Sequence, residues 1–210
     1  MAKRGKFITI EGQDGAGKST NVAVIESFLE QHGISYIKSR EPGGTPFSEN
    51  IREILLNSSD TEIGDTAELL LVFAARAQHI EQVIEPALTR GDWVLCDRFT
   101  DATYAYQGSG RGLGNSLIAQ LEQSVQGDLR PDLTVLLDLP IEIGESRAGQ
   151  RSSPDRFEQQ QLNFKQKVRD GYLVLAKEQA HRVKIVDASK DIAAVAESIN
   201  DVLDDFYRNV

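Results

Sequence analysis

Residues 11–20 read EGQDGAGKST, a stretch that combines glycines with one lysine and a hydroxyl group. The spacing G-x-x-x-x-G-K-[ST], which begins at Gly12 and ends at Ser19, is typical of loops that bind nucleotide phosphates. In such a loop the backbone N–H groups face one anion, Lys18 contacts the β and γ phosphates, and the Ser19 hydroxyl ligates magnesium. The residues expected to bind the nucleotide are Gly12, Gln13, Asp14, Gly15, Ala16, Gly17, Lys18, Ser19 and Thr20.

An acidic residue inside a loop for anions needs a reason, and Asp14 has two candidate roles. A turn aspartate commonly accepts hydrogen bonds from the backbone close to it. Alternatively, the Asp14 carboxylate contacts a substrate group other than phosphate. The loop sequence is compatible with both roles.

A second pair of charged residues, Asp97 and Arg98, follows the apolar run WVLC. Open α/β sheets bind their ligands at the carboxyl ends of such strands. We expect Asp97 to face the magnesium ion of Ser19, and the Arg98 guanidinium can hold a phosphate through two parallel hydrogen bonds. The plainer alternative is a surface ion pair between these neighbours.

Charge and motif content narrow the class of nucleotide-binding protein. The net charge of −9 argues against nucleic acid or anionic lipid as a partner, because basic surfaces usually meet them. A GTPase would carry an N-K-x-D tetrapeptide, and none occurs in the sequence. No stretch approaches the roughly 18 apolar residues of a membrane span, and the lone Cys96 lies in an apolar run. We therefore expect a soluble, cytoplasmic protein without disulfides.

Short apolar runs alternate with longer segments of helical period. Strands that are apolar at nearly every position indicate a sheet buried on both faces, which means parallel strands covered by helices. The sequence therefore predicts an α/β fold with a doubly wound parallel sheet flanked by helices, in a single domain spanning 1–210. Strands are expected at 7–11, 34–39, 93–97, 133–139 and 183–188, and helical segments at 18–32, 46–56, 65–90, 115–126, 155–180 and 191–207. The stretches SGRGLG and RSSPD are expected to be mobile loops.

Several residues mark the ends of the expected helices. Gly33 ends the first helix, and Thr45 begins the second as an N-cap. The pair Asp65 and Glu68 has the spacing of a capping box. Pro86 should kink or split the long segment 65–90, because it lacks a backbone donor and its ring clashes with the preceding turn.

Six sequence blocks together resemble one family. They are REPGGT (40–45), FAARAQH (73–79), DRF (97–99), AYQGSGRG (105–112), RPDLTVLLDL (130–139) and DRFEQ (155–159). In this order and at these intervals they resemble the bacterial thymidylate kinases, a family of nucleoside monophosphate kinases with a phosphate-binding loop, over nearly the whole chain. The resemblance implies transfer of the ATP γ-phosphoryl group to dTMP, which gives dTDP for dTTP synthesis, with Mg2+ as cofactor and usually in a homodimer.

The resemblance also implies roles for the charged residues. Lys18 and the loop amides would hold the donor and Arg98 the acceptor phosphate, while Asp14 would accept a hydrogen bond from the 3′-hydroxyl of the acceptor. The span 147–158 would be a short lid. Family members with glycine after the loop carboxylate, as at Gly15, supply the catalytic arginine from the lid, which points to Arg151.

Two further lid arginines, Arg147 and Arg156, are weaker candidates for that catalytic role, and Arg147 is expected at the ATP. Composition alone favours a different interpretation of the span RAGQRSSPDRFE, in which the arginines lie on a solvated helix face.

For the thymine base, the resemblance implies a contact between Arg76 and O4. Many members stack the base on an aromatic residue four positions before this arginine, where the present chain has Val72, so Phe73 is the aromatic candidate. The helical pattern alone would place Phe73 in the core. Ala102 stands where the family often has serine, which leaves Thr103 as the hydroxyl expected beside the base.

The remaining acceptor contacts are expected from the sugar and phosphate side. Tyr106 would crowd a ribose 2′-hydroxyl, and Gln107 matches the family block beside it. Arg52 could reach the acceptor phosphate or form a surface ion pair. Pro42 and Glu41 would form a rigid turn at the acceptor pocket.

Two other functions are compatible with the phosphate loop. Another nucleoside or nucleotide kinase, for example one acting on a deoxynucleoside, would need a general base beside a 5′-hydroxyl, whereas the phosphate of dTMP is already nucleophilic. A nucleotide-binding switch or scaffold would have no evident use for arginines in the lid.

Overall fold

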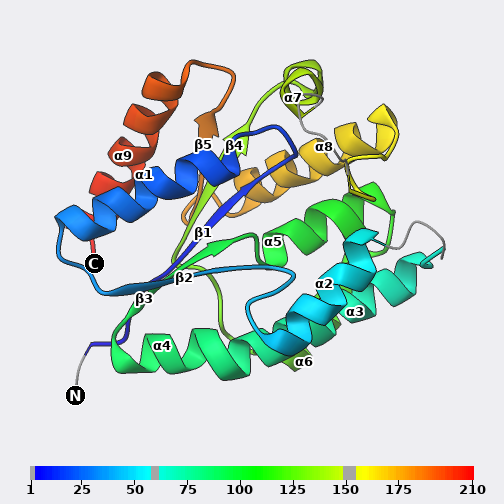
Figure 1. Ribbon diagram of the computed structural model, residues 1–210, viewed down its shortest axis with the longest axis horizontal. Coiled ribbons are helices and arrows are strands. Elements are labelled where there is room, and N and C mark those ends of the chain that lie inside the picture. Colours follow the sequence, from blue (N-terminus) through cyan, green and yellow to red (C-terminus); the bar gives the residue numbers. More distant parts are fainter. Residues whose placement is uncertain (1–2, 58–61, 149–154) are drawn as a thin grey trace.

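The computed structural model describes residues 3–57, 62–148 and 155–210 of the chain. Its centre is a five-stranded sheet in the order β2-β3-β1-β4-β5, in which every neighbouring pair is parallel (Figure 1). The strands are β1 (Phe7–Gly12), β2 (Tyr36–Arg40), β3 (Trp93–Asp97), β4 (Leu133–Asp138) and β5 (Val183–Asp187). The predicted α/β fold is therefore confirmed.

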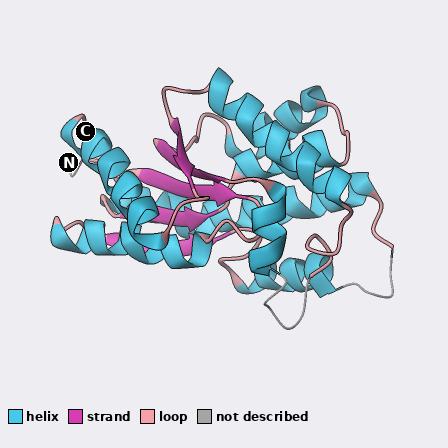
Figure 2. Cartoon of the chain, turned by 90° about the horizontal axis from the view of Figure 1, so that it is seen from above, coloured by secondary structure: helices cyan, strands magenta, loops and turns pink. Residues whose placement is uncertain are grey.

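Helices connect the strands and cover both faces of the sheet, as Figure 2 shows. They are α1 (Lys18–Gln31), α2 (Pro46–Asn57), α3 (Asp65–His79), η1 (Ile80–Ile84), α4 (Glu85–Arg90), α5 (Thr100–Thr103), η2 (Tyr104–Gly110), α6 (Asn115–Gln126), α7 (Ile141–Ala148), α8 (Leu162–Glu178) and α9 (Ile192–Arg208). The segments η1 and η2 are π-helical. None of the helices in the described ranges is both long and apolar enough to cross a bilayer.

The core explains why the strands are apolar on both sides. Adjacent residues of a strand point to opposite faces. Val135 of β4 packs in the cluster that α1 and α9 cover, and its neighbour Leu136 packs in the cluster that α8 covers. All six residues of β1 are buried. The central strands therefore have no face left for water, because helices cover both sides of the sheet.

Two of the predicted helix ends are confirmed. Gly33 has a φ of 65°, and its N–H donates to the carbonyl oxygen of Glu30. Thr45 accepts a hydrogen bond from the Ser48 N–H through its hydroxyl at 3.1 Å. The expected capping box is wrong, because Gly64 is the N-cap of α3 without a side-chain cap bond, and the Glu68 carboxylate is buried among more distant partners.

The segment 65–90 is divided as expected, because the π-helical η1 separates α3 from α4, and Pro86 lies in the first turn of α4, where its missing N–H is tolerated. The structure corrects two other expectations. Ser109 and Gly110, the first two residues of the expected loop SGRGLG, belong to η2. The helix expected at 155–180 begins only at Leu162, and α7 was not predicted. The stretch RSSPD lies outside the described residues except for Asp155.

Candidate active site

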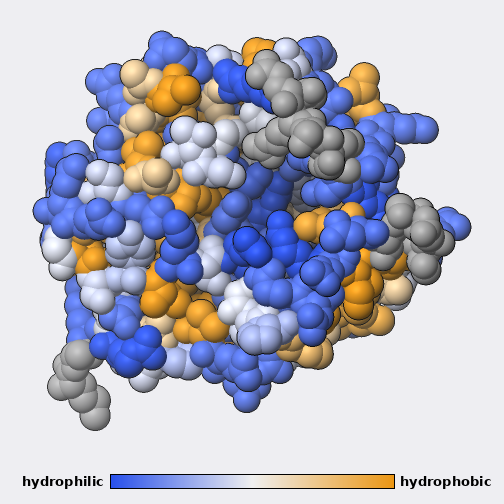
Figure 3. All heavy atoms as spheres, in the orientation of Figure 1, coloured by the Kyte–Doolittle hydropathy of each residue, from blue (hydrophilic) through white to orange (hydrophobic). Residues whose placement is uncertain are grey.

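A cavity of about 210 Å3 lies at the carboxyl edge of the sheet. The register pairs Ile10 of β1 with Asp97 of β3, so the phosphate loop after β1 lies beside the end of β3. Hydrophilic residues gather in a hollow near the middle of the face that Figure 3 shows. The lining residues are Asp14, Gly15, Gly17, Lys18, Ser19, Glu41, Pro42, Arg52, Leu55, Leu56, Val72, Arg76, Asp97, Arg98, Phe99, Ala102, Thr103, Tyr106, Gln107, Asp155, Phe157 and Glu158.

The phosphate loop can form only with glycine at two positions. Gly12 has a φ of 144°, and a Cβ atom there would lie 2.6 Å from the carbonyl oxygen of Leu137. Gly15 has a φ of 77°, and its Cβ atom would lie 2.2 Å from the carbonyl oxygen of Gly144 in α7. A side chain at either position would push the loop away from the sheet or from α7. The loop is thus held close to both.

Lys18 is the first residue of α1 and points back across the loop. Its Nζ atom donates to the carbonyl oxygen of Gly12 at 3.2 Å. Burial lowers the pKa of the Lys18 ammonium, the nearby Arg98 charge lowers it further, and Asp97 and Asp14 oppose this shift. Lys18 and the amino end of α1 would therefore together stabilise a group of high negative charge in the cavity.

Asp97 and Ser19 fit the requirements of a magnesium ion. Both line the cavity, and Asp97 Oδ1 is buried without a hydrogen-bond partner among the residues described. Magnesium in phosphoryl-transfer sites commonly uses one or two carboxylates together with water and substrate phosphates. The described ranges contain no cluster of three or more acidic, histidine or cysteine side chains that could hold a metal alone. An ion at Asp97 and Ser19 would therefore need water or substrate phosphates as further ligands.

Arg98 is held in an uncommon backbone conformation at the end of β3. Its φ is 70°, which is rare outside glycine. Its guanidinium donates to Asp14 Oδ1 at 3.2 Å and to the Tyr172 hydroxyl at 3.0 Å, and lies 4.9 Å from the ring centroid of Tyr106. Burial lowers the pKa of Arg98, but Tyr106, Tyr172 and Asp14 outweigh it, so the pKa is raised overall. A permanent positive charge therefore faces the phosphate loop.

Behind Arg98 lies a fully buried carboxylate, Glu11. It accepts hydrogen bonds from the Phe99 N–H at 2.7 Å and from the Tyr172 hydroxyl at 2.7 Å. Burial raises the pKa of Glu11 to about 7, against the opposing charge of Arg98. Glu11 and Tyr172 thus form a hydrogen-bonded support for Arg98.

Arg76 of α3 also lines the cavity and is the largest fully buried side chain among the described residues, with an exposed fraction of 1%. Its Nε atom donates to Glu41 at 2.8 Å and its Nη2 atom to the Thr103 hydroxyl at 3.0 Å. Glu41 also contacts His79 Nδ1 at 3.0 Å, and His79 Nε2 lies 2.6 Å from the Ser39 hydroxyl. Arg76 Nη1 has no partner among the described residues. This donor is therefore fixed, buried and available.

Four other expected acceptor residues line the same cavity. Tyr106 and Gln107 come from η2, and the Gln107 amide donates to Glu68 at 2.8 Å. Arg52 of α2 donates to the Pro42 carbonyl oxygen at 2.9 Å, and burial lowers its pKa, with Arg40 adding to the effect. Arg52 therefore contacts another residue that lines the cavity, which is compatible with the expected acceptor role.

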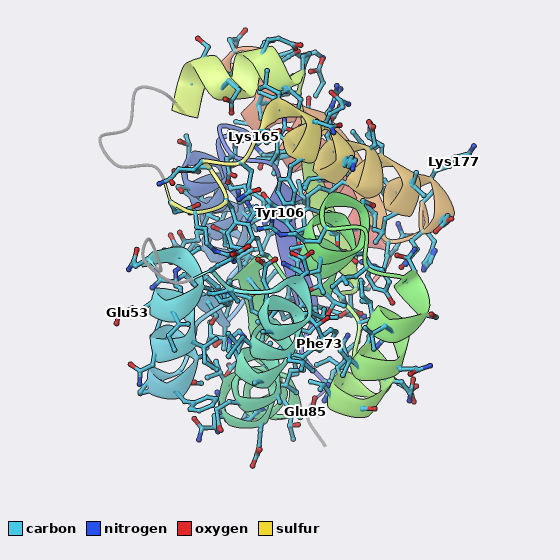
Figure 4. The ribbon with its side chains drawn as sticks, turned by 90° about the vertical axis from the view of Figure 1, so that its right-hand side faces the viewer. Glu53, Phe73, Glu85, Tyr106, Lys165 and Lys177 are labelled. Carbon is cyan, nitrogen blue, oxygen red and sulfur yellow. The ribbon has the colours of Figure 1, made fainter. Side chains whose placement is uncertain are left out.

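Phe73 is a correction, since it is not among the described residues that line the cavity. Its ring packs with Leu69 and with Ile118 of α6, and the guanidinium carbon of Arg76 lies 4.9 Å from its centroid. Figure 4 shows Phe73 low on α3, apart from Tyr106. Residues four apart share a helix face, so Val72 is the α3 residue that joins Arg76 at the cavity.

The expected lid residues differ in their placement. Arg151 lies outside the described residues. Arg147 donates to the carbonyl oxygens of Ala188 at 2.7 Å and Ser189 at 3.3 Å, on the loop after β5. Arg156 does not point at the phosphate loop but donates to the Leu55 carbonyl oxygen at 2.9 Å and to a buried carboxylate. In the loop itself, Gly12, Gln13, Ala16 and Thr20 are not among the described lining residues.

Sequence reasoning missed several residues of the site. Glu11 carried a usable signal, because it is a charged residue at the end of an apolar strand, next to the phosphate loop. Tyr172 carried none, since it lies 161 residues from Glu11 on a helix whose pattern indicates only a buried face. The lining residues Asp155, Phe157 and Glu158 belong to the span expected as a lid, 147–158, but none of them was expected individually at the site.

Comparisons with known proteins agree with this geometry. A family model described as thymidylate kinase matches residues 10–199. The thymidylate kinase of Pseudomonas syringae pv. tomato is 57% identical over 199 residues, 95% of each chain, and that of Teredinibacter turnerae is 52% identical over 202 residues, 96% of this chain and 98% of the relative. The crystal structure of the thymidylate kinase from Ehrlichia chaffeensis matches with a TM-score of 0.78 and 32% identity over 95% of this chain and 99% of that one. The chain therefore belongs to the thymidylate kinase family.

Proposed function

We propose that this site transfers the γ-phosphoryl group of ATP to the phosphate of dTMP and releases dTDP for dTTP synthesis. Membership of the thymidylate kinase family makes the chain a nucleoside monophosphate kinase. The observation that carries the proposal is the arrangement of one cavity, with Lys18 and the phosphate loop near Arg98, and the unpaired donor Arg76 Nη1 among its lining. Such a cavity can hold a phosphate near the loop and a polar base edge at Arg76.

The donor side uses the phosphate loop. We assign the β and γ phosphates of ATP to the loop N–H groups, to Lys18 and to the amino end of α1. Ser19 and Asp97 would hold Mg2+, which supplies neutralisation of charge on the phosphate oxygens when bound. Arg147 would contact ATP beside the loop after β5.

The acceptor phosphate is assigned to Arg98 and Arg52. Both line the cavity, and the Arg98 fork can hold a phosphate through two hydrogen bonds. Asp14 accepts from Arg98 through Oδ1, and we assign its second oxygen to the 3′-hydroxyl of the sugar. This answers why an anion-binding loop carries an acid, because Asp14 orients the arginine that holds the second phosphate.

Base selection is assigned to Arg76 and Thr103. Arg76 Nη1 would donate to O4 of thymine, whereas cytosine presents an amino group there and leaves this buried donor without a partner. A site that hydrogen-bonds a substrate group can reject an analogue lacking it by about 10⁴-fold, but one methyl group contributes only about 10- to 200-fold. Discrimination against dCMP should therefore exceed discrimination against dUMP. Tyr106 and Gln107 would line the sugar and base, with Tyr106 excluding a 2′-hydroxyl.

The reaction needs positioning and charge balance more than proton transfer, because the acceptor phosphate is already a nucleophile. Lys18 and Arg98 hold the two phosphates, and Arg151 is assigned from the family resemblance as the arginine that balances the transferring charge. We further propose a cytoplasmic homodimer. Apolar Leu70 of α3 and Leu117 of α6 are 51% and 38% exposed, and a second copy could cover them.

A coupled assay of ADP release with dTMP, dUMP, dCMP and thymidine tests the function. We expect the highest kcat/KM with dTMP, a loss of about 10-fold or more with dUMP and a far larger loss with dCMP. Faster turnover of thymidine than of dTMP would contradict the proposal and would favour a deoxynucleoside kinase. Sedimentation of the purified protein tests the dimer separately.

A further inference from the structure

Glu68 of α3 is a buried carboxylate outside the cavity that binds side chains from three other segments. Its exposed fraction is 0%. It accepts hydrogen bonds from the Gln107 amide at 2.8 Å, from Arg111 Nη2 at 3.1 Å, and from Arg156 Nη2. One carboxylate therefore binds an amide from η2, a guanidinium group from the residue that follows η2, and a second guanidinium group from the segment before α8.

The segment 155–160 is docked onto the two helices α2 and α3 through Arg156. The Arg156 N–H donates to the Leu56 carbonyl oxygen at 3.3 Å, and its Nε atom donates to the Leu55 carbonyl oxygen at 2.9 Å. These carbonyl groups are at the last turn of α2, where a positive charge is favourable. Gln160 adds a contact, since its side-chain oxygen accepts from Arg111 at 3.1 Å.

This docked segment forms one wall of the cavity. Asp155, Phe157 and Glu158 line it, and the Phe157 ring meets the Tyr106 ring edge-on with 5.6 Å between centroids. The Arg156 guanidinium carbon lies 4.7 Å from the Phe157 centroid. Because Arg156 is fixed by Glu68, the position of Phe157 over Tyr106 depends on the same carboxylate. Gln107, a second lining residue, is held by Glu68 directly.

Glu68 thus touches two walls of the acceptor end without being one of the described residues that line it. We propose that Glu68 is a positioning residue that sets the affinity for the acceptor nucleotide, by fixing Gln107 and, through Arg156, Phe157. The inference rests on the proposed function, which assigns this end of the cavity to dTMP. None of the partners of Glu68 is among the residues assigned to ATP, which are the phosphate loop with Lys18, Ser19, Asp97 and Arg147, so ATP binding should not depend on it.

The charges around Glu68 give the sign of the effect. The side chains of Arg111 and Arg156 are only 13% and 17% exposed. Replacing the carboxylate by an amide leaves Arg156 without a counter-charge, and it leaves Arg111 with only the half-exposed Asp65 at 3.6 Å. They would move apart, and Phe157 and Gln107 would follow. Misplacement by about 1 Å of groups that hold a substrate can cost about 10²-fold.

The experiment compares Glu68→Gln and Arg156→Met with the unaltered chain in two measurements, steady-state kinetics and equilibrium titration with dTMP and with ATP. We expect KM and Kd for dTMP to rise at least about 10-fold in Glu68→Gln, with KM for ATP within about 2-fold. Arg156→Met leaves Glu68 paired with Arg111. It should show the same rise of the dTMP constants with little change of KM for ATP. If Glu68 acts through Arg156, the double variant should be less impaired than the product of the two single effects.

A control is Arg130→Met, which also takes a guanidinium partner from a largely buried carboxylate, Glu122 of α6 at 2.8 Å, where neither residue lines the cavity. It should lower stability while both KM values stay unchanged. The inference is overturned if Glu68→Gln keeps the dTMP constants of the unaltered chain, or if its constants for dTMP and ATP change alike. Should Glu68→Gln not fold, unchanged dTMP affinity in Arg156→Met overturns it. Absence of dTMP phosphorylation in the unaltered chain would instead contradict the proposed function.

Discussion

Arg98 donates a hydrogen bond from Nη1 to the hydroxyl oxygen of Tyr172 at 3.0 Å, and the same hydroxyl donates to Glu11 at 2.7 Å. Tyr172 therefore connects the arginine at the cavity to a carboxylate in the core. Asp14 holds the other side of the guanidinium at 3.2 Å. With both sides held, Arg98 can meet a phosphate without reorganising, which is the condition for efficient electrostatic catalysis.

Removing this hydroxyl should weaken acceptor binding. In Tyr172→Phe one bond of Arg98 is lost, and hydrogen bonds to charged groups contribute about 1.5–3 kcal/mol. We expect KM for dTMP to rise about 10-fold or more, since about 1.4 kcal/mol corresponds to a factor of ten, with KM for ATP nearly unchanged. Tyr104→Phe is the matched control, because the Tyr104 hydroxyl bonds Glu122 on α6 at 2.6 Å. Equal kinetics in the two variants would contradict this role of Tyr172.

The raised pKa of Glu11 predicts a pH dependence of stability. Its pKa rises from 4.5 to about 7 because burial disfavours the charged form, while Arg98 opposes the shift and Asp101 adds to it. A raised folded-state pKa means that the folded chain retains the proton, so this contribution is complete below pH 4.5 and is lost as the pH rises through 7. At 1.36 kcal/mol per pKa unit the loss is on the order of 3 kcal/mol.

Glu11→Gln should remove this dependence. Urea unfolding at pH 5 and at pH 8 would measure the free energy of unfolding of both proteins. From pH 5 to pH 8 the unaltered chain should lose more stability than the variant. A difference in unfolding free energy that is the same at both pH values would show that Glu11 does not titrate in this range.

Base selectivity should depend on Thr103. In Thr103→Val the shape is kept, but Arg76 Nη2 loses its acceptor at 3.0 Å. A buried donor left without a partner costs about 1–3 kcal/mol, and Arg76 would turn to find another acceptor. We expect the ratio of kcat/KM for dTMP to that for dCMP to fall about 10-fold or more.

The control for this change is Thr100→Val, whose hydroxyl donates to Gln126 at 2.6 Å away from the cavity. That variant should be destabilised to a similar extent with its base selectivity intact. An equal fall of the ratio in both variants would mean that general loosening, and not the orientation of Arg76, sets the selectivity.

Two ion pairs should differ strongly in their effect on stability. Arg182 and Asp101 are 7% and 3% exposed, whereas Arg4 and Glu85 are 49% and 46% exposed. Breaking a buried pair from one side costs about 3–5 kcal/mol, and an exposed pair contributes about 0–1 kcal/mol. Urea unfolding should therefore show a large loss for Arg182→Met and little for Arg4→Met. Similar losses in the two variants would contradict this expectation.

The sheet and the phosphate loop could be predicted because their signals are local. The run FITIE is apolar at nearly every residue since β1 is buried on both faces, and the loop glycines are required by backbone angles within the motif itself. The segment η2 had no such signal. A Cβ atom at Gly110 would lie 2.6 Å from the Phe164 ring, so this position of η2 is restricted by a contact with α8 that is distant in sequence.

Glu68 shows why parts of the site could not be predicted. Its spacing from Asp65 indicates a capping box, which is a local interaction. Its observed partners Gln107, Arg111 and Arg156 are 39, 43 and 88 residues away in sequence. Phe73 shows the converse. Its spacing of three residues predicts a shared helix face with Arg76, and its ring centroid does lie 4.9 Å from the guanidinium carbon. Packing with Leu69 and with Ile118, which is distant in sequence, keeps the ring out of the described cavity lining.

The most direct test of the account is a crystal structure with dTMP and a non-hydrolysable ATP analogue bound together. We expect the dTMP phosphate on Arg98, thymine O4 on Arg76 Nη1, and the γ-phosphate on Lys18, with the reacting atoms about 3–3.5 Å apart in line. Finding dTMP outside this cavity, or its phosphate too far from the γ-phosphate for direct transfer, would contradict it.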